Sequence, residues 1–260
     1  MAIRANALAV MAKAPIAGQV KTRLMPLLTA GEAAELSRSL LVDQLNHVQE
    51  LVVADLYLAF VPDDTRSLMQ QLTPACFHLF PQQGGDLGSR MAAVFERLFQ
   101  MGHKNIALIG GDLPPVPLRF FNQAYAFLES SEKRVVLGPS RDGGYYLVGS
   151  NRPTPEIFQG MSWSHSEVLK ETQNRLASLR VAYCLLPPWF DIDTVDDLRY
   201  LESVLDNALK EAMTNTLPLL QRLGVNKQLV HWPEADLALA ASLDCVNVKL
   251  KAPNCPPAMP

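Results

Sequence analysis

The sequence contains few cysteines and no long apolar run. Its four cysteines, Cys76, Cys184, Cys245 and Cys255, are far apart and form no Cys-x-x-Cys pair, which argues against a disulfide framework and against a zinc cluster. No window reaches the ~18 consecutive apolar residues of a membrane span. The first residues also lack the long apolar stretch and the cleavage site of a secretory signal. We therefore expect a cytoplasmic protein with no membrane partner.

An excess of charge of either sign is also missing. The 260 residues carry a formal net charge of -3, with 48% hydrophobic and 19% charged residues. Without a basic surplus, electrostatics give no support to a nucleic-acid partner, and any site for an anion must be local. The length and composition are those of a globular protein that buries a substantial core.

What the sequence does contain is an alternation of short apolar runs and helical patterns. Strands are predicted at residues 7–11, 55–61, 77–80, 106–109, 135–138, 145–148 and 181–186. Helices are predicted at residues 29–50, 64–72, 87–101, 118–128, 164–176 and 194–210. The first helix begins with a Thr29-x-x-Glu32 capping box. Several strands are continuously apolar, which predicts a three-layer α/β/α fold with a mostly parallel sheet.

The pattern weakens after Gly224. Residues 225–260 show little periodicity and end in the proline-rich segment KAPNCPPAMP. We expect residues 1–224 to form one domain and residues 225–260 to form a peripheral C-terminal extension.

Charged residues and glycines gather where the predicted strands end, and ligands of open α/β sheets bind beyond the carboxyl ends of strands. Lys21 and Arg23 follow the first strand, after a loop that holds Gly18. An ammonium and a guanidinium group suit phosphate oxygens, and loop N–H groups could bind the same anion. Two solvated charges on an exposed loop are the alternative. A Walker A motif is excluded, because two residues separate Gly18 from Lys21.

Carboxylates follow two other strands. Asp112 comes directly after the apolar strand 106–109, and Asp191 and Asp193 flank Ile192 after the last strand. Mg²⁺ bridged to phosphates needs one or two such carboxylates. The alternative for Asp112 is to cap the turn or the next helix, and for the other two to cap the helix at Thr194.

Two glycine clusters allow a functional and a structural interpretation. Gly84, Gly85 and Gly88, with Ser89, could admit a base or ribose close to the backbone, or could simply form a turn. In SRDGGYY, the two glycines can form a hairpin turn, with charged and aromatic neighbours that suit an acceptor site. Trp163 is expected in the core, with a wall of the acceptor pocket as the alternative.

The chain resembles a family of GT-A-like transferases described as glycosyltransferase-like or radical-SAM/selenodomain-associated. The segments that carry the resemblance lie in family order between about Leu8 and Leu201, and they are AKAPIAGQVKTRL, GDLGSRM, IGGDLPPV, VLGPSRDGGYYLVG, MSWSHSEVL and DIDTVDDL. More remotely, the chain is similar to phospholactate guanylyltransferases and molybdenum-cofactor nucleotidyltransferases. The resemblance implies a nucleotide-diphospho-sugar transferase fold, with residues 1–224 as a nucleotide-binding transferase domain.

The resemblance also implies roles for the residues at the strand ends. Mg²⁺ or Mn²⁺ would be held by Asp112 with Asp193 or Asp191. Lys21, Arg23 and Asp142 would act in catalysis. The nucleotide would be bound by Ala14, Gly18, Lys21, Arg23, Gly88, Ser89 and Arg90. The small-molecule acceptor would be bound by Arg141, Asp142, Gly143, Gly144 and Tyr145.

Three functions remain open at this point. The first is nucleotidyl transfer, in which a phosphate or hydroxyl acceptor attacks the α-phosphorus of a nucleoside triphosphate. It is favoured because Gly-Gly-Asp-Leu-Pro replaces the Asp-x-Asp of glycosyltransferases and is closer to the guanylyltransferases. The second is glycosyl transfer from a nucleotide sugar, with Asp142 orienting the acceptor hydroxyl. The third is a non-catalytic nucleotide- or partner-binding module. The sequence specifies neither the nucleobase nor the number of subunits.

Overall fold

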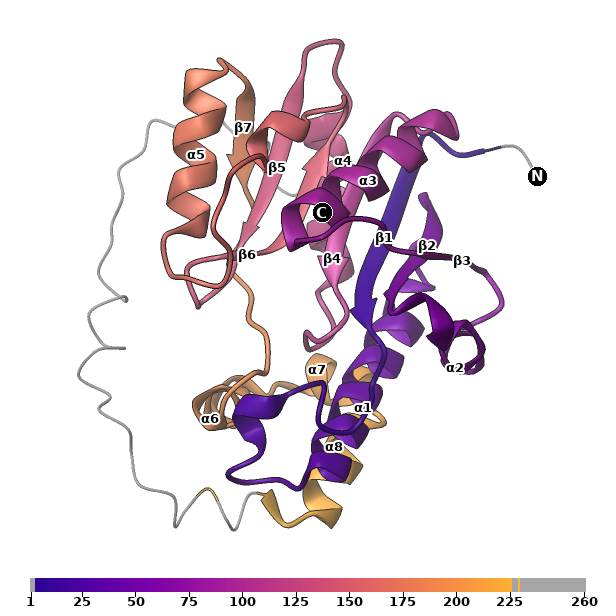
Figure 1. Ribbon diagram of the computed structural model, residues 1–260, viewed down its shortest axis with the longest axis vertical. Coiled ribbons are helices and arrows are strands. Elements are labelled where there is room, and N and C mark those ends of the chain that lie inside the picture. The colour runs from indigo at the N-terminus through magenta and orange to yellow at the C-terminus, as the bar shows by residue number, and fades with distance from the viewer. Residues whose placement is uncertain (1–2, 226–228, 230–260) are drawn as a thin grey trace.

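The centre of the molecule is a single mixed sheet (Figure 1). The computed structural model describes residues 3–225 and residue 229, so the predicted C-terminal extension lies almost entirely outside the described residues. The strands are β1 (Asn6–Lys13), β2 (Ala54–Val61), β3 (Phe77–Pro81), β4 (Asn105–Gly110), β5 (Arg134–Pro139), β6 (Tyr145–Ser150) and β7 (Ala182–Leu185).

The seven strands are arranged in the order β3-β2-β1-β4-β6-β5-β7. All neighbouring pairs are parallel except those of β6, which runs antiparallel to both β4 and β5. The prediction of a mostly parallel sheet is therefore confirmed. The two glycines of SRDGGYY form the hairpin turn between β5 and β6, which brings that turn to the edge where the parallel strands end.

Eight α-helices surround the sheet in the described part of the chain. They are α1 (Ala30–Val48), α2 (Arg66–Leu72), α3 (Leu87–Gln100), α4 (Leu118–Leu128), α5 (Val168–Ser178), α6 (Val195–Val204), α7 (Asn207–Ala212) and α8 (Thr216–Arg222). The Thr29–Glu32 capping box is present at α1. No helix in residues 3–225 has both the length and the hydropathy that crossing a bilayer requires.

Two predicted helix boundaries are wrong for local reasons. The helix expected from residue 164 begins at Val168, because Ser164 has a φ of 66°, which no helix accommodates. The helix expected over 194–210 is divided into α6 and α7, because the side chain of Asp206 accepts a hydrogen bond from the Leu209 N–H and so caps a new helix.

Side chains of successive residues in β1 enter different cores. Leu8 and Val10 pack with α1, α2 and α4 on one face of the sheet, whereas Ala7 and Ala9 pack with α3 and α5 on the other. Alternate residues of a strand point to opposite faces, so a strand buried on both sides must be apolar throughout. This explains the continuous apolar runs and confirms the three-layer α/β/α prediction.

A third core forms beyond the carboxyl ends of the parallel strands, where α6, α7 and α8 pack on α1 (Figure 1). Asp43 of α1 joins this layer to the rest of the molecule. Its fully buried carboxylate accepts hydrogen bonds from the backbone N–H groups of Asn215, at 2.9 Å, and Thr216, at 2.8 Å. The start of α8 is thus held by a side chain from α1.

Candidate functional site

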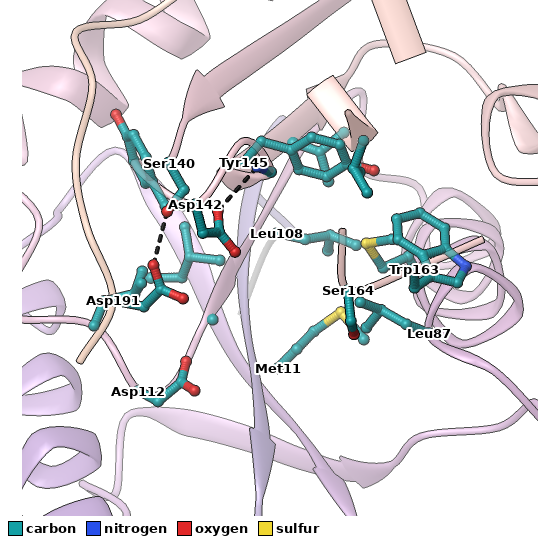
Figure 2. A pocket seen from close by; sticks show the side chains of 18 of the residues that line it. Met11, Leu87, Leu108, Asp112, Ser140, Asp142, Tyr145, Trp163, Ser164 and Asp191 are labelled. Atoms are coloured by element: carbon teal, nitrogen blue, oxygen red, sulfur yellow. Dashed lines mark hydrogen bonds between the residues drawn. The ribbon is translucent and has the colours of Figure 1, made fainter. Parts of the chain in front are cut away.

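The segments predicted to meet at the strand ends do meet. A cavity of about 340 Å³ lies beyond β4 and the β5–β6 turn (Figure 2). A second cavity of about 210 Å³ lies on the β1 side and shares Met11 and Asp112 with the first. We call them the larger and the smaller cavity. The segment after β3 contributes Leu87 to the larger one, and the segment after β1 contributes Lys21 to the smaller one.

Lys21 is the central charged residue. Its side chain is only 2% exposed, and its Nζ lies 2.7 Å from Oδ1 of Asp193 and 3.1 Å from Oδ2 of Asp112. Burial alone would lower the pKa of Lys21, but the two carboxylates outweigh it and the pKa lies above its ordinary value. The Lys21 ammonium group in turn lowers the pKa of Asp112. Lys21 and Asp112 are therefore both ionised at neutral pH.

The backbone of Lys21 is in an unusual conformation. Its φ of 49° and ψ of 35° place it in the left-handed region, at the start of the 3₁₀ turn Thr22–Leu24. A non-glycine residue there costs about 1 kcal/mol, so the surrounding structure must hold it. The loop before it thereby directs the lysine inward, while Arg23 two residues later is exposed and lines neither cavity.

Asp112 is positioned by two glycines and a neighbouring loop. A Cβ atom on Gly111 would lie 2.9 Å from Cβ of Ala12 and 3.0 Å from Cδ1 of Leu41, so only glycine fits beside β1 and α1. The carbonyl of Asp112 also accepts a hydrogen bond from the N–H of Ile192, at 3.5 Å. The Gly-Gly-Asp sequence thus reflects close packing at the end of β4.

Asp193 is free to bind Lys21 because other residues cap α6. The Asp197 carboxylate accepts hydrogen bonds from the N–H groups of Asp193 and Thr194 and from the Thr194 hydroxyl. Thr194 and Asp197 thereby form a capping box. The helix-capping alternative for Asp191 and Asp193 is therefore wrong, since neither carboxylate caps the helix.

Asp191 and Asp142 face the larger cavity, together with Asp112 (Figure 2). Oδ1 of Asp191 accepts a hydrogen bond from the Ser140 hydroxyl at 2.7 Å, and Oδ1 of Asp142 accepts one from the Gly144 N–H at 2.9 Å. Burial, together with repulsion from the neighbouring carboxylates, raises the pKa of Asp191 to about 6. This wall of the cavity is strongly acidic.

The opposite wall is apolar. It is formed by the side chains of Met11, Leu87, Met91 and Trp163, with Tyr145 beside the indole. The Tyr145 and Trp163 rings lie edge to face with 6.5 Å between their centres. Trp163 also packs against Phe158 in the core, so it meets both the expectation of a core position and the alternative of a pocket wall.

Gly88, Ser89 and Arg90, expected near the nucleotide, line neither cavity. A Cβ on Gly88 would lie 2.6 Å from Cζ2 of Trp163, so this glycine makes room for the indole. Ser89 forms a capping box with Asp86 at the start of α3, and Arg90 donates a hydrogen bond to the Gly84 carbonyl. The structure gives each of these residues a contact within the fold.

Other predicted residues lie around the two cavities without lining them. Ala14 is buried, and its N–H donates to the Val61 carbonyl. Gly18 adopts a φ of 76° in the exposed loop before Lys21. The guanidinium of Arg141 stacks 3.4 Å from the centre of the Tyr200 ring, directed away from the larger cavity.

The hairpin glycines differ in their roles. Gly143 has a φ of 87°, and a Cβ there would lie 2.0 Å from the Ser166 carbonyl oxygen, so the turn requires glycine. Gly144 lines the larger cavity. Sequence reasoning missed two residues of the site, Lys13 in the smaller cavity and Ser140 beside Asp191. Lys13 lies in the segment AKAPIAG and Ser140 in PSRDGG. Each is close to the end of a strand, and this position is the signal that could have identified them.

The carboxylates fit a metal that is shared with a substrate. Asp112 and Asp193 already converge on one cation, the Lys21 ammonium group. Among the described residues no three histidine, cysteine or acidic side chains form a complete metal site. Mg²⁺ commonly binds one or two carboxylates and completes its coordination with phosphate oxygens and water, so two carboxylates suffice for a metal that arrives with a nucleotide.

Known proteins of similar structure have the same architecture. One is a protein from Desulfovibrio desulfuricans G20 provisionally described as a nucleotide-diphospho-sugar transferase, with a TM-score of 0.77 and 29% identity over 88% of this chain and 98% of that one. The chain has the nucleotide-diphospho-sugar transferase fold. The predicted fold and the resemblance are thereby confirmed, and this similarity supports the prediction of a transferase.

Two more distant structures share the fold alone. A cytidylyltransferase from Leptospira borgpetersenii serovar Hardjo-bovis (strain JB197) has a TM-score of 0.52 at 10% identity, over 89% of this chain and 99% of that one. The 4-diphosphocytidyl-2C-methyl-D-erythritol synthase of Anaerococcus prevotii DSM 20548 has a TM-score of 0.51 at 10% identity, over 77% and 96%. Residues 44–165 match the family model described as "Uncharacterized protein conserved in bacteria (DUF2064)". None of the curated proteins compared with the chain matches it.

Proposed function

We propose that this chain is a Mg²⁺-dependent transferase that uses a nucleotide donor and transfers its nucleotidyl group to a small acceptor. The observation that carries the proposal is the contact of Lys21 with Asp112 and Asp193. It places one buried cation and two carboxylates at the strand ends, where phosphates bind in this class of sheet. The description of the similar protein from D. desulfuricans G20 supports a nucleotide donor.

The proposed reaction depends on positioning and charge compensation. The acceptor oxygen forms a bond to the α-phosphorus, the bond from that phosphorus to the bridging oxygen breaks, and pyrophosphate leaves with the bonding electrons. A hydroxyl acceptor gives up its proton to the carboxylate of Asp142 or Asp191. Lys21 stabilises the negative charge that spreads over the phosphate oxygens, with Lys13 at the outer end of the smaller cavity. Mg²⁺ held by Asp112 and Asp193 would supply further charge compensation on the same oxygens.

Thermal unfolding tests this function directly. The full chain is mixed with nucleoside triphosphates, nucleoside diphosphates and nucleotide sugars, each with and without Mg²⁺. A ligand at about 100 times its dissociation constant adds roughly 2.7 kcal/mol of stability, so binding is visible as a raised Tm. We expect a Mg²⁺-dependent rise with one triphosphate, which would also identify the base. No rise with any of these compounds would contradict the proposal.

Two variants sharpen the experiment. Asp112→Asn should abolish the Mg²⁺-dependent part of the Tm rise and lower turnover by about a hundredfold or more, while the fold stays intact. Asp64→Asn, which removes a carboxylate from an exposed turn, should change neither. If the Asp112→Asn variant turned over substrate as fast as the natural chain, Asp112 would not be part of the proposed metal site.

Glycosyl transfer from a nucleotide sugar is the second candidate, and the description of the similar protein from D. desulfuricans G20 as a nucleotide-diphospho-sugar transferase favours it. Asp142 and Asp191 lie beside the shared Asp112, where either carboxylate could accept the proton of an acceptor hydroxyl. The leaving group separates the two reactions, since nucleotidyl transfer releases pyrophosphate and glycosyl transfer releases a nucleoside diphosphate. Chromatography of the reaction products decides between them.

A further inference from the structure

The two cavities that meet at Asp112 differ in the charged side chains that line them. The smaller cavity is lined by two lysines, Lys13 and Lys21, together with the carboxylates of Asp112 and Asp193. The larger cavity is lined by Asp112, Asp142 and Asp191, by one histidine, His165, and by no lysine or arginine of the described residues. Ammonium groups that can bind phosphate oxygens therefore line only the smaller cavity, whereas the carboxylates of the larger one favour a ligand that donates hydrogen bonds.

The arginines near the larger cavity are engaged elsewhere. Arg141 stacks on the Tyr200 ring, and Arg90 donates to the Gly84 carbonyl. Arg175 donates to the carbonyls of Gln159 and Gly160. None of these guanidinium groups lines the cavity, so none is placed to bind an anionic group of an acceptor.

The two carboxylates on this wall keep free acceptor oxygens. Ser140 and Gly144 each donate to one oxygen, the Oδ1 atoms of Asp191 and Asp142. Within residues 3–225 neither carboxylate forms an ion pair. Figure 2 shows both side chains directed toward the space that Asp112 also faces. A ligand in this space therefore meets carboxylate oxygens that can accept hydrogen bonds from its O–H groups.

The wall across the cavity favours an apolar ligand surface. Met11, Leu87 and Trp163 present thioether, methyl and indole groups to the same space (Figure 2). A ligand with hydroxyl groups on one side and C–H groups on the other matches both walls of this cavity of about 340 Å³. A sugar ring has both.

We propose that the larger cavity binds the acceptor and that this acceptor is an uncharged polyol of the sugar type. Its hydroxyl groups donate to Asp142 and Asp191, and its apolar face packs on Trp163. Phosphorylated and carboxylated acceptors are disfavoured, because an anion would meet the carboxylates of Asp142 and Asp191, which form no ion pair among the described residues. The inference rests on the proposed function, in which the donor phosphates bind at Lys21.

An acceptor assay with matched compounds tests the proposal. The full chain, loaded with the nucleotide and Mg²⁺ that raise its Tm, is given sugars and their phosphate esters in pairs, such as glucose with glucose 6-phosphate. We expect donor consumption to be stimulated at least about a hundredfold more by the neutral member of a productive pair. Preference for the phosphate ester would overturn the proposal while leaving the proposed function intact, because nucleotide binding is measured separately.

A second measurement needs no turnover. Ser164 lines the larger cavity, so Ser164→Cys places a thiol there, in a background where the other accessible cysteines are replaced by serine. A methanethiosulfonate reagent with a trimethylammonium group should modify this thiol about tenfold faster than the sulfonate reagent of similar size. Mass spectrometry follows both rates.

If the acidic wall causes the difference between the two modification rates, removing its charges should reduce the ratio of these rates. Combining Asp142→Asn with Asp191→Asn should lower the ratio several-fold, whereas Asp64→Asn on its exposed turn should leave it unchanged. Equal rates for the two reagents in the starting protein, or faster reaction of the sulfonate, would overturn the proposal whatever the identity of the acceptor. Failure of every nucleotide to raise the Tm would instead contradict the proposed function.

Discussion

The ammonium nitrogen of Lys21 lies 2.7 Å from Oδ1 of Asp193, a residue 172 positions further along the chain. Asp112 provides a second carboxylate oxygen at 3.1 Å. The lysine thus fills the position from which a divalent cation would contact both carboxylates. If the proposed metal binds here, we expect it to compete with the ammonium group for the same two oxygens and to release Lys21 toward the phosphates that enter with it.

Replacing Lys21 tests this competition. In Lys21→Met, two adjacent carboxylates lose their counter-charge, and we expect the free energy of unfolding in EDTA to fall by about 1 to 3 kcal/mol. The loss is smaller than for a fully buried pair because the Asp112 and Asp193 side chains are 47% and 38% exposed. Mg²⁺ alone should restore stability in the variant but change the natural protein little. Thermal unfolding in EDTA and in MgCl₂ measures both effects.

Lys104→Met is the matched control, since Lys104 is exposed and forms no ion pair among the described residues. It should change stability by less than about 0.5 kcal/mol under both conditions. An equal Mg²⁺ response in Lys21→Met and the natural protein would show that the lysine does not compete with a metal.

Asp43→Ala should destabilise the layer of C-terminal helices. The substitution leaves the buried N–H groups of Asn215 and Thr216 without their acceptor, at an expected cost of about 2 to 4 kcal/mol. Urea-induced unfolding measures the loss, and hydrogen exchange should locate the fastest new opening in α8. Asp64→Ala, on an exposed turn, should stay within about 0.5 kcal/mol of the natural chain. Unchanged protection of α8 would contradict the role of Asp43.

Gly111→Ala and Gly31→Ala should act in opposite directions. The new methyl group at Gly111 meets Ala12 and Leu41 within about 3 Å, so we expect a loss of about 1 to 3 kcal/mol and a displaced Asp112. Gly31 lies in the first turn of α1 with open space around it, so alanine should stabilise the helix by about 0.5 to 1 kcal/mol. Denaturant unfolding compares the two, and loss of stability in both would contradict this explanation of Gly111.

His47 should make stability depend on pH. Burial lowers its pKa, and its Nε2 atom has no hydrogen-bond partner among the described residues. The unfolded chain therefore binds a proton more readily, and the free energy of unfolding falls as the pH drops below about 6.5. His47→Gln should reduce this fall between pH 7.5 and 5.5. Parallel pH profiles for variant and natural chain would show that His47 contributes nothing.

Local signals allowed much of the fold to be predicted. The apolar strands are buried on both faces, so their composition alone identified them, and the α1 capping box is visible in four residues. The division between α6 and α7 was missed because Asp206 competes as a new cap within an otherwise helical pattern. The packing of α8 on Asp43 joins residues too far apart for any pattern to reveal.

The sequence predicted where the site lies but not which of its side chains contact one another. Topology brings Lys21, Asp112 and Asp193 to one edge of the sheet, and this followed from their places after strands. Their direct contact depends on the left-handed backbone of Lys21 and on the loop that Asp197 holds, neither of which the sequence indicates. Arg23 and Arg141, chosen for their charge, point elsewhere because loop geometry rather than sequence proximity directs each side chain.

The reversed direction of β6 has a consequence for how this site can change. Residues on both sides of a single tight turn, Ser140 and Asp142 before it and Gly144 and Tyr145 after it, reach the larger cavity. Strands flank that turn on either side, and its contact with α5 is made by the backbone of Gly143, whose carbonyl accepts a hydrogen bond from the Leu169 N–H at 2.9 Å, so the other residues of the turn can vary while this glycine is kept. The β5–β6 turn is therefore a compact unit that could be exchanged between related chains to alter one half of the specificity while the lysine and its two carboxylates stay in place.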